Sequence, residues 1–124
     1  MDNLTTAVHE LLQFQVFIKI YHWQTKTYSR HIASDKLYDS ISNKIDLIVE
    51  SLQGEQKKRI KFTSTCVLNL ENMSDKTFGT LLIKCREWLE TTFLQMFSHS
   101  TFLVNIKDEI VTDINKTLYL FTLE

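Results

Sequence analysis

Four polar residues in the first half of the chain have the types and the spacing of a metal site. His22 and His31 lie nine residues apart, and Asp46 and Glu50 follow at a spacing of four residues. On an α-helix, residues i and i+4 lie on one face about 6 Å apart along the axis, so the two carboxylates can share one or two cations. Imidazole nitrogens together with carboxylate oxygens suit Fe(II), Zn(II) or Mn(II) rather than the soft metals that prefer thiolates.

A purely structural interpretation of the same residues remains open. A histidine on a largely apolar helix is more often a hydrogen-bonded packing residue, and an acidic pair on an outer helix face is usually only hydrated. A second acidic cluster, Asp108, Glu109 and Asp113, has no histidine nearby, so we expect it to be a solvated or interface face. His9 and His99 also lack a second ligand at metal-binding spacing.

The elements that must position these residues are predicted to be helices. The chain has 124 residues, no proline and only two glycines, a composition that helices tolerate and many-turned β folds usually do not. Capping signals and apolar periodicity predict four helices, with Ser29 and Ser74 as N-caps and Gly54 as a left-handed C-cap. The helices span about residues 4–25, 30–53, 75–97 and 101–123. We therefore expect an all-α protein, a four-helix bundle formed by one domain over residues 1–124.

A long connection separates the second and third predicted helices. It reads GEQKKRIKFTSTCVLNLENMS, with a basic start followed by apolar residues at intervals. These are Ile60, Phe62, Val67, Leu68 and Leu70. Apolar side chains at this density favour an ordered crossover strap that packs on the bundle over a flexible linker.

Helical phase predicts where the two carboxylates point. One narrow apolar stripe runs along the second helix, formed by Leu37, Ile41, Ile45, Ile48 and Leu52. At about 100° per residue, Asp46 falls roughly 140° and Glu50 roughly 180° from the middle of that stripe. Both carboxylates therefore point away from the core of their own bundle.

The first helix carries apolar residues on every side. Its three apolar rows contain Leu11 and Ile18, then Leu12, Val16, Ile20 and Trp23, then Phe14, Phe17 and Tyr21. A helix that is apolar all round must be buried all round, yet every helix of a four-helix bundle has an outward side. The surplus apolar surface therefore predicts a second chain packed there, facing the outward carboxylates of the second helix.

Composition argues against several classes of partner and compartment. Lys and Arg number 14 against 15 Asp and Glu, and the start MDNLTTA has no basic arm, so we expect no nucleic-acid interface. The most apolar window, LLQFQVFIKIYHW, contains Gln, Lys and His, so we expect no membrane span. Cys66 and Cys85 lack CxxC spacing and no signal peptide is evident, so we expect a reducing, cytoplasmic location.

The segment that holds the four candidate ligands keeps a distinctive set of intervals. A His-Trp pair ends the first predicted helix, and a second histidine opens the next. An acidic residue follows four positions later, a Leu-Tyr pair six and seven positions later, and an Asp and a Glu eight and twelve positions after the Tyr. The residues are His22-Trp23, His31, Asp35, Leu37-Tyr38, Asp46 and Glu50. In these intervals, residues 22–50 resemble the ferroxidase segment of the Dps family, the mini-ferritins of the ferritin-like superfamily.

The resemblance implies a fold, a site and an activity. The fold would be a ferritin-like four-helix bundle with a crossover strap between helices two and three. Dps proteins build their iron site across the twofold interface of a dimer and oxidise Fe(II) with peroxide or oxygen. Carried over to this chain, His22 and His31 would be ligands from one chain, and Asp46 and Glu50 would be ligands from its neighbour.

The resemblance also implies roles for two further residues and an oligomeric state. Asp35 would bind a second iron or support the ligands from behind, and Trp23 would lie beside the ligand histidine. The protein would form a homodimer at least, with a larger cage as the state that allows iron storage. Along most of its length the chain is also similar to a group of ferritin-like proteins from large DNA viruses, with which it shares IYHWQTK, NIKDEI and YLFTL.

The chain departs from the Dps pattern around His22. The stretch between His22 and His31 is a few residues shorter than in that family, Thr27 replaces a Gly, and Ser51 replaces an Arg. We therefore expect the loop next to His22 to have its own geometry. A metal site inside one bundle would need Glu-x-x-His on two helices, and no Glu-x-x-His occurs in the sequence.

Two functions from different classes therefore stand as expectations. The first is a Dps-like ferroxidase that binds iron at a homodimer interface, with Zn(II) or Mn(II) also compatible with the donor set. The second is a catalytically silent ferritin-like bundle that acts as a dimeric structural or interaction module. They differ in whether Fe(II) and peroxide yield a ferric product that depends on Asp46 and Glu50.

Overall fold

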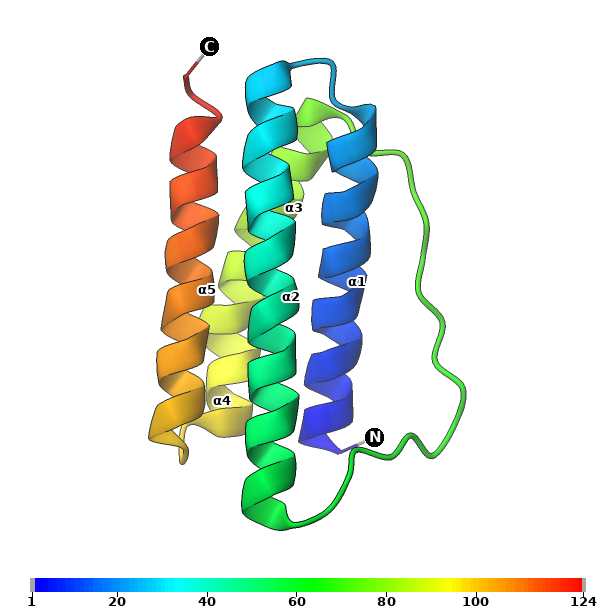
Figure 1. The fold of residues 1–124 in the computed structure, drawn as a ribbon, viewed down its shortest axis with the longest axis vertical. Helices are drawn as coiled ribbons and strands as arrows, with labels where there is room; N and C mark the ends of the chain where they lie inside the picture. Colours follow the sequence, from blue (N-terminus) through cyan, green and yellow to red (C-terminus); the bar gives the residue numbers. More distant parts are fainter. Residues whose placement is uncertain (1, 124) are drawn as a thin grey trace.

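The computed structural model describes residues 2–123 as an all-helical bundle, with no β-strand among them (Figure 1). Four rods make up the bundle, and the third consists of two α-helices joined through a π-helical segment. The elements are α1 (Asn3–Gln24), α2 (Tyr28–Gln56), α3 (Asp75–Trp88), η1 (Leu89–Phe93), α4 (Leu94–Phe97) and α5 (Thr101–Leu120). The prediction of an all-α four-helix bundle is confirmed.

The direction of the rods follows from the lengths of their connections. Short connections join α1 to α2 and α4 to α5, so the helices of each pair run antiparallel (Figure 1). Residues 57–74 instead travel the length of the bundle before α3 begins, so α2 and α3 point the same way. The bundle therefore contains one long crossover connection between its two antiparallel helix pairs.

Helix ends agree with the prediction only in part. Ser74 is the N-cap of α3, and its side chain accepts a hydrogen bond from the backbone of Thr77 as expected. Ser29 is not a cap, because α2 already begins at Tyr28 after the N-cap Thr27. Gly54 is not a C-cap either, since α2 continues to Gln56 and the left-handed position, with φ 55°, is taken by Lys57.

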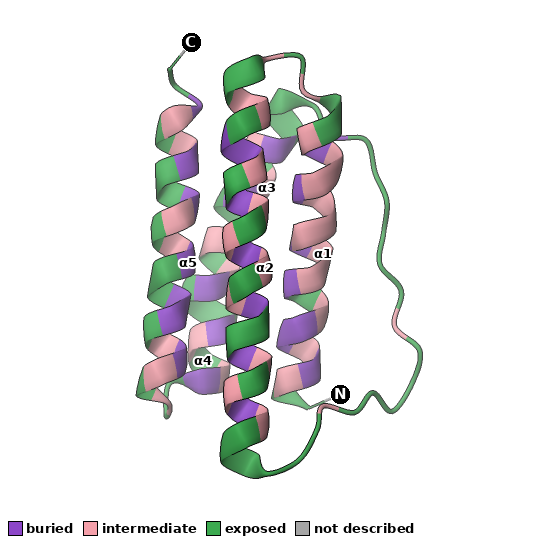
Figure 2. Ribbon diagram, in the orientation of Figure 1, coloured by how far each residue is buried: buried purple, intermediate pink, exposed green. Residues whose placement is uncertain are grey.

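The core is formed by inward stripes of all four rods. The apolar stripe predicted for α2 is buried along its whole length (Figure 2). It packs with buried residues of α1 and of the later helices in one continuous cluster. Burial of such stripes is the main stabilising contribution to a bundle of this size, since each buried large apolar side chain contributes about 1.5–3 kcal/mol.

A buried aromatic cluster closes the end of the bundle where α1 passes into α2. The ring of Tyr21 is fully buried and stacks on Phe78 with ring centroids 4.2 Å apart. Its hydroxyl donates to Asp75 Oδ1 at 2.7 Å and accepts from Arg30 at 3.3 Å. Burial raises the pKa of Tyr21 above its ordinary value. Arg30 also donates to the Phe121 carbonyl at 3.0 Å, so this cluster holds the ends of four helices together, α1, α2, α3 and α5.

The crossover, residues 57–74, is attached to α1 by side-chain hydrogen bonds. Gln13 makes two of them, because its Nε2 donates to the Asn69 carbonyl at 3.0 Å and its Oε1 accepts from the Asn69 amide at 2.7 Å. Gln24 accepts from the Met73 amide at 2.6 Å, and His9 is bonded to the Val67 carbonyl. These hydrogen bonds hold the crossover beside α1. Its apolar residues do not pack on the bundle as predicted, since Val67 is 72 % and Leu70 77 % exposed.

An outer face of α1 and α2 remains uncovered in the single chain. Trp23 near the end of α1 is 69 % exposed, and Tyr28 at the start of α2 is 77 % exposed. Within residues 2–123, no helix is both long enough and apolar enough to cross a membrane.

Candidate functional site

The candidate site begins at the tight corner between α1 and α2. Only residues 25–27 separate the two helices, so the last turn of α1 meets the first turn of α2. His22 and His31 lie face to face across this corner, with ring centroids 3.8 Å apart and an angle of 17° between the ring planes. Both side chains are half-buried. The structure therefore brings the two predicted histidine ligands together.

Reciprocal hydrogen bonds define the orientation of both imidazoles. His22 Nδ1 donates to the His31 carbonyl at 2.8 Å, and His31 Nδ1 donates to the His22 carbonyl at 2.8 Å. Because a carbonyl can only accept, each neutral ring must carry its hydrogen on Nδ1 and keep a lone pair on Nε2. A metal-binding histidine commonly donates its second ring N–H to a carbonyl in this way. The pair thus leaves the Nε2 atoms of both rings available as ligands.

Two neighbours of the pair complete the corner. Asp35 Oδ1 lies 3.9 Å from His22 Nε2, and its side chain remains 48 % exposed. Ser34 is fully buried beneath the rings, where its hydroxyl donates to the His31 carbonyl at 3.1 Å. Asp35 was predictable from the sequence, whereas the contact of Ser34 was not predicted. A small polar residue three positions after His31, on the buried side of α2, was the available signal.

Asp46 and Glu50 lie on the same helix as His31 but far along its axis. Both are exposed, as helical phase predicted. At a rise of about 1.5 Å per residue, Asp46 is about 22 Å and Glu50 about 28 Å from His31 along α2. One chain therefore cannot join its own histidines and acids around a single cation. Consistent with this, residues 2–123 of one chain contain no group of three His, Cys, Asp or Glu side chains that could hold a metal ion.

The second acidic cluster has a structural role between helices. Asp113 accepts from the Ser40 hydroxyl, and Lys44 lies 3.7 Å from Asp113 and 3.8 Å from Glu109. These contacts join α2 to α5. Asp108 instead pairs at 2.6 Å with the adjacent Lys107. Asp108 and Glu109 are exposed, as expected of a solvated face, whereas Asp113 makes a contact inside the bundle that was not predicted.

Lys107 is a buried charge that the sequence analysis did not anticipate. Its ammonium group pairs with Asp108 and with Glu90 of the π-helical segment η1, at 3.4 Å. The hydrogen bond to Asp108 raises the pKa of Lys107 above its ordinary value, so the group stays charged. A π-helical segment inserts one extra residue into a helical turn, and here it supplies Glu90, whose half-exposed carboxylate pairs with the buried Lys107.

The thiol of Cys85 does not form a reactive centre. Burial raises the pKa of Cys85 to about 12. Because the thiolate is the nucleophilic and metal-binding form, this thiol is inert near neutral pH. Cys85 therefore adds no thiolate ligand, and the donor groups proposed for the candidate site are imidazoles and carboxylates.

Comparison with known proteins assigns the chain to one family. The model of DUF5856, a family of unknown function, matches residues 22–121, so the chain belongs to that family. The matched region starts at His22 and includes all four candidate ligands. No curated protein and no solved structure matches the chain.

Proposed function

We propose that this member of the DUF5856 family binds Fe(II) in the seam between two copies of the chain and oxidises it, in the manner of Dps mini-ferritins. His22 and His31 of one copy and Asp46 and Glu50 of the other would be the ligands. Asp35 would bind a second iron or orient the first. Zn(II) and Mn(II) also fit this donor set.

The observation that carries the proposal is the reciprocal pairing of His22 and His31. Two imidazoles held side by side, each with its Nδ1 hydrogen occupied by a carbonyl, leave both Nε2 lone pairs free for a cation. The two rings also stack on each other with centroids 3.8 Å apart, which restricts their orientation. Such preorganisation lowers the cost of assembling a site, because the ligands need little reordering.

A second copy could supply the missing carboxylates through an antiparallel contact of the two α2 helices. The midpoint between His31 and the acidic pair falls at about residues 39–40 of α2. A twofold axis there would bring the acids of each copy to the histidines of the other, at two equivalent sites. The exposed carboxylates and the exposed Trp23 beside His22 lie on helices α2 and α1, which such a contact would cover.

The topology of the bundle supports the same family of folds. Ferritin-like bundles differ from simple up-and-down bundles by one long crossover connection. Residues 57–74 make one long connection between α2 and α3, and their hydrogen bonds to α1 are compatible with such a crossover.

The proposed chemistry balances with peroxide as the oxidant. Two ferrous ions, the substrate, each give up one electron, the O–O bond of one peroxide breaks, and two protons are taken up to give two waters. The carboxylates of Asp46 and Glu50 would hold the more highly charged ferric product, because hard cations prefer oxygen ligands. If the dimers assembled into a cage, the product would be stored.

A second candidate function rests on the same two histidines. Their reciprocal hydrogen bonds already join α1 to α2 without a cation. The exposed acids of one chain, moreover, are about 22 Å away from them. A catalytically silent bundle that serves as a dimeric structural or interaction module would need nothing more from these residues.

Anaerobic titration with Fe(II), followed by peroxide, separates the two functions. The proposed ferroxidase should develop ferric absorbance, and the double variant Asp46→Asn, Glu50→Gln should lose it. Both acids are exposed, so the variant should remain folded. The double variant Glu71→Gln, Glu87→Gln is the matched control, since both side chains are exposed and neither is a proposed ligand. A flat trace for the unmodified protein, or unchanged oxidation by the acid variant, would refute the proposal.

A further inference from the structure

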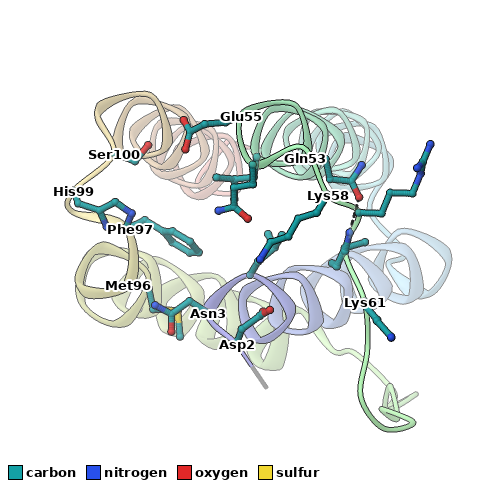
Figure 3. A pocket seen from close by; sticks show the side chains of 15 residues that line it. Asp2, Asn3, Gln53, Glu55, Lys58, Lys61, Met96, Phe97, His99 and Ser100 are labelled. Carbon is teal, nitrogen blue, oxygen red and sulfur yellow. Dashed lines mark hydrogen bonds between the residues drawn. The ribbon is translucent and has the colours of Figure 1, made fainter.

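A separate cavity, shown in Figure 3, lies at the end of the bundle where α1 begins and α2 ends, opposite the α1–α2 connection (Figure 1). Its volume is about 580 Å³, within the range of small-molecule sites. Four elements surround it: the start of α1, the end of α2 with the following residues 57–61, the end of α4 and the corner before α5. None of the candidate metal ligands lines it.

Part of the cavity wall is apolar and rigid. Leu52 and Phe97 are each only 5 % exposed and belong to the core, and Leu4 and Met96 pack against that core. The Phe97 ring points towards the open space in Figure 3. This wall can take up the apolar body of a ligand, since contact there removes further apolar surface from water.

Another wall carries a dense group of positive charges. Lys58, Arg59 and Lys61 line the cavity, and none of the three forms an ion pair with the described residues 2–123. The Lys58 side chain extends between the end of α2 and the start of α1, whereas Lys61 points away (Figure 3). Lys58 is therefore the cation best placed to meet a ligand inside.

The acidic groups at the cavity compensate for this charge incompletely. Asp2 and Glu55 also line it, so the three cations exceed the two carboxylates. Asp2 is already engaged as the N-cap of α1, where its Oδ1 accepts from the Thr5 amide at 2.8 Å and from the Thr5 hydroxyl at 2.9 Å. Because Lys61 points away from the cavity, Lys58 is the group that favours a ligand with an anionic part.

Ser100 adds an unused polar group on the far wall. Within residues 2–123, its Oγ is the one buried side-chain oxygen or nitrogen without a hydrogen-bond partner. Ser100 precedes α5 but does not cap it, and the first turn of α5 contains no acidic residue. The first amides of α5 thus keep their positive partial charge. A buried hydroxyl without a partner calls for a group that completes its bonding.

We propose that this end cavity binds a small organic anion, a phosphate ester or carboxylate joined to an apolar body. The anionic group meets Lys58, the apolar body lies against Leu52 and Phe97, and a further polar atom of the ligand bonds to Ser100. Of these three contacts, the one to Ser100 completes the bonding of a buried oxygen that otherwise has no hydrogen-bond partner among residues 2–123. This site is independent of the iron site at the other end.

Octyl phosphate, used below its micelle concentration, is a suitable probe for amide NMR titration. Binding should be saturable, with amide shifts confined to residues 2–4, 52–61 and 96–103. The Lys58→Met variant should weaken binding roughly tenfold or more, because it removes a charge-assisted hydrogen bond but keeps the apolar stem. Lys36→Met, at an exposed position of α2 outside the cavity, is the matched control and should bind like the unmodified protein.

Two further probes test each half of the ligand. Inorganic phosphate lacks the apolar body and octyl glucoside lacks the charge, so each should bind at least roughly tenfold more weakly than octyl phosphate. Shifts spread over the whole molecule, equal affinity for any of the three probes, or equal weakening by Lys58→Met and Lys36→Met would overturn the proposal. Absence of saturable binding would overturn it as well, whatever the outcome of the iron experiments.

Discussion

His22 and His31 stack face to face, and each ring donates its Nδ1 hydrogen to the main-chain carbonyl of the other residue. This double contact joins the last turn of α1 to the first turn of α2 over a connection of only residues 25–27. The contact should stabilise the folded chain even without a metal. It can complete a metal site only if a second chain supplies the carboxylates.

The stability consequence can be measured with a double-mutant cycle. His22→Ala and His31→Ala should each lower the free energy of unfolding by about 1–2 kcal/mol, because each removes a hydrogen bond and the ring stack. The double variant should lose about 0.5–1 kcal/mol less than the sum, since the stack is lost only once. Urea unfolding in a chelator measures all four free energies. Additive losses would mean that the rings do not stabilise one another.

The shared site can be tested by mixing two inactive variants. One chain would carry His22→Ala with His31→Ala, and the other Asp46→Asn with Glu50→Gln. A mixed dimer has one seam with all four ligands intact, so refolding the two together should restore up to about a quarter of the unmodified activity. With random pairing, half of the dimers are mixed, and each mixed dimer has one intact site out of two. No recovery in a mixture shown by mass to contain mixed dimers would rule out ligands from two copies.

The buried Tyr21 should give the protein a characteristic alkaline response. Tyr21→Phe should cost about 1–2 kcal/mol near neutral pH, because the bond to Asp75 is lost. The raised pKa of Tyr21 means that its contribution is fully present below about pH 10 and declines as pH rises further. The stability difference between the two proteins should therefore shrink above pH 10. Lys107, whose pKa is also raised, is present in both proteins and cancels in the comparison.

The two hydrogen bonds of Gln13 should hold the crossover on α1. Gln13→Ala should speed amide hydrogen exchange at Asn69 roughly fivefold or more, because the acceptor of that amide is removed. The Met73 amide keeps its bond to Gln24 and should change less. Gln95→Ala, at an exposed position of α4, is the control and should leave both amides unchanged. Equal exchange in all three proteins would show that the strap is held by other contacts.

Helical periodicity made much of the fold predictable. The stripe from Leu37 to Leu52 is buried as expected, and Asp46 and Glu50 are exposed as expected, because the phase of a helix depends only on its own residues. Helix ends were less predictable. Gly54 could end α2 but lies inside it, since nothing in the structure forces the helix to stop there.

Other features could not be predicted, because they depend on distant parts of the chain. Residues 57–74 are held beside α1 by hydrogen bonds to Gln13 and Gln24, and the sequence pattern of the crossover pointed instead to its apolar residues. The π-helical segment η1 interrupts a rod whose ends were predicted correctly. Its position opposite the buried Lys107 is a contact between two rods.

The sequence by itself determined that the chain forms helices, which face of α2 is buried, and that two imidazoles and two outward carboxylates are available as ligands. Only the tertiary structure decided that His22 and His31 stack and exchange hydrogen bonds, and that one chain keeps them about 22 Å from its own Asp46. The reason is physical. Helical phase is set by local backbone geometry, whereas the carbonyl that an imidazole meets depends on how two helices pack across the corner that joins them.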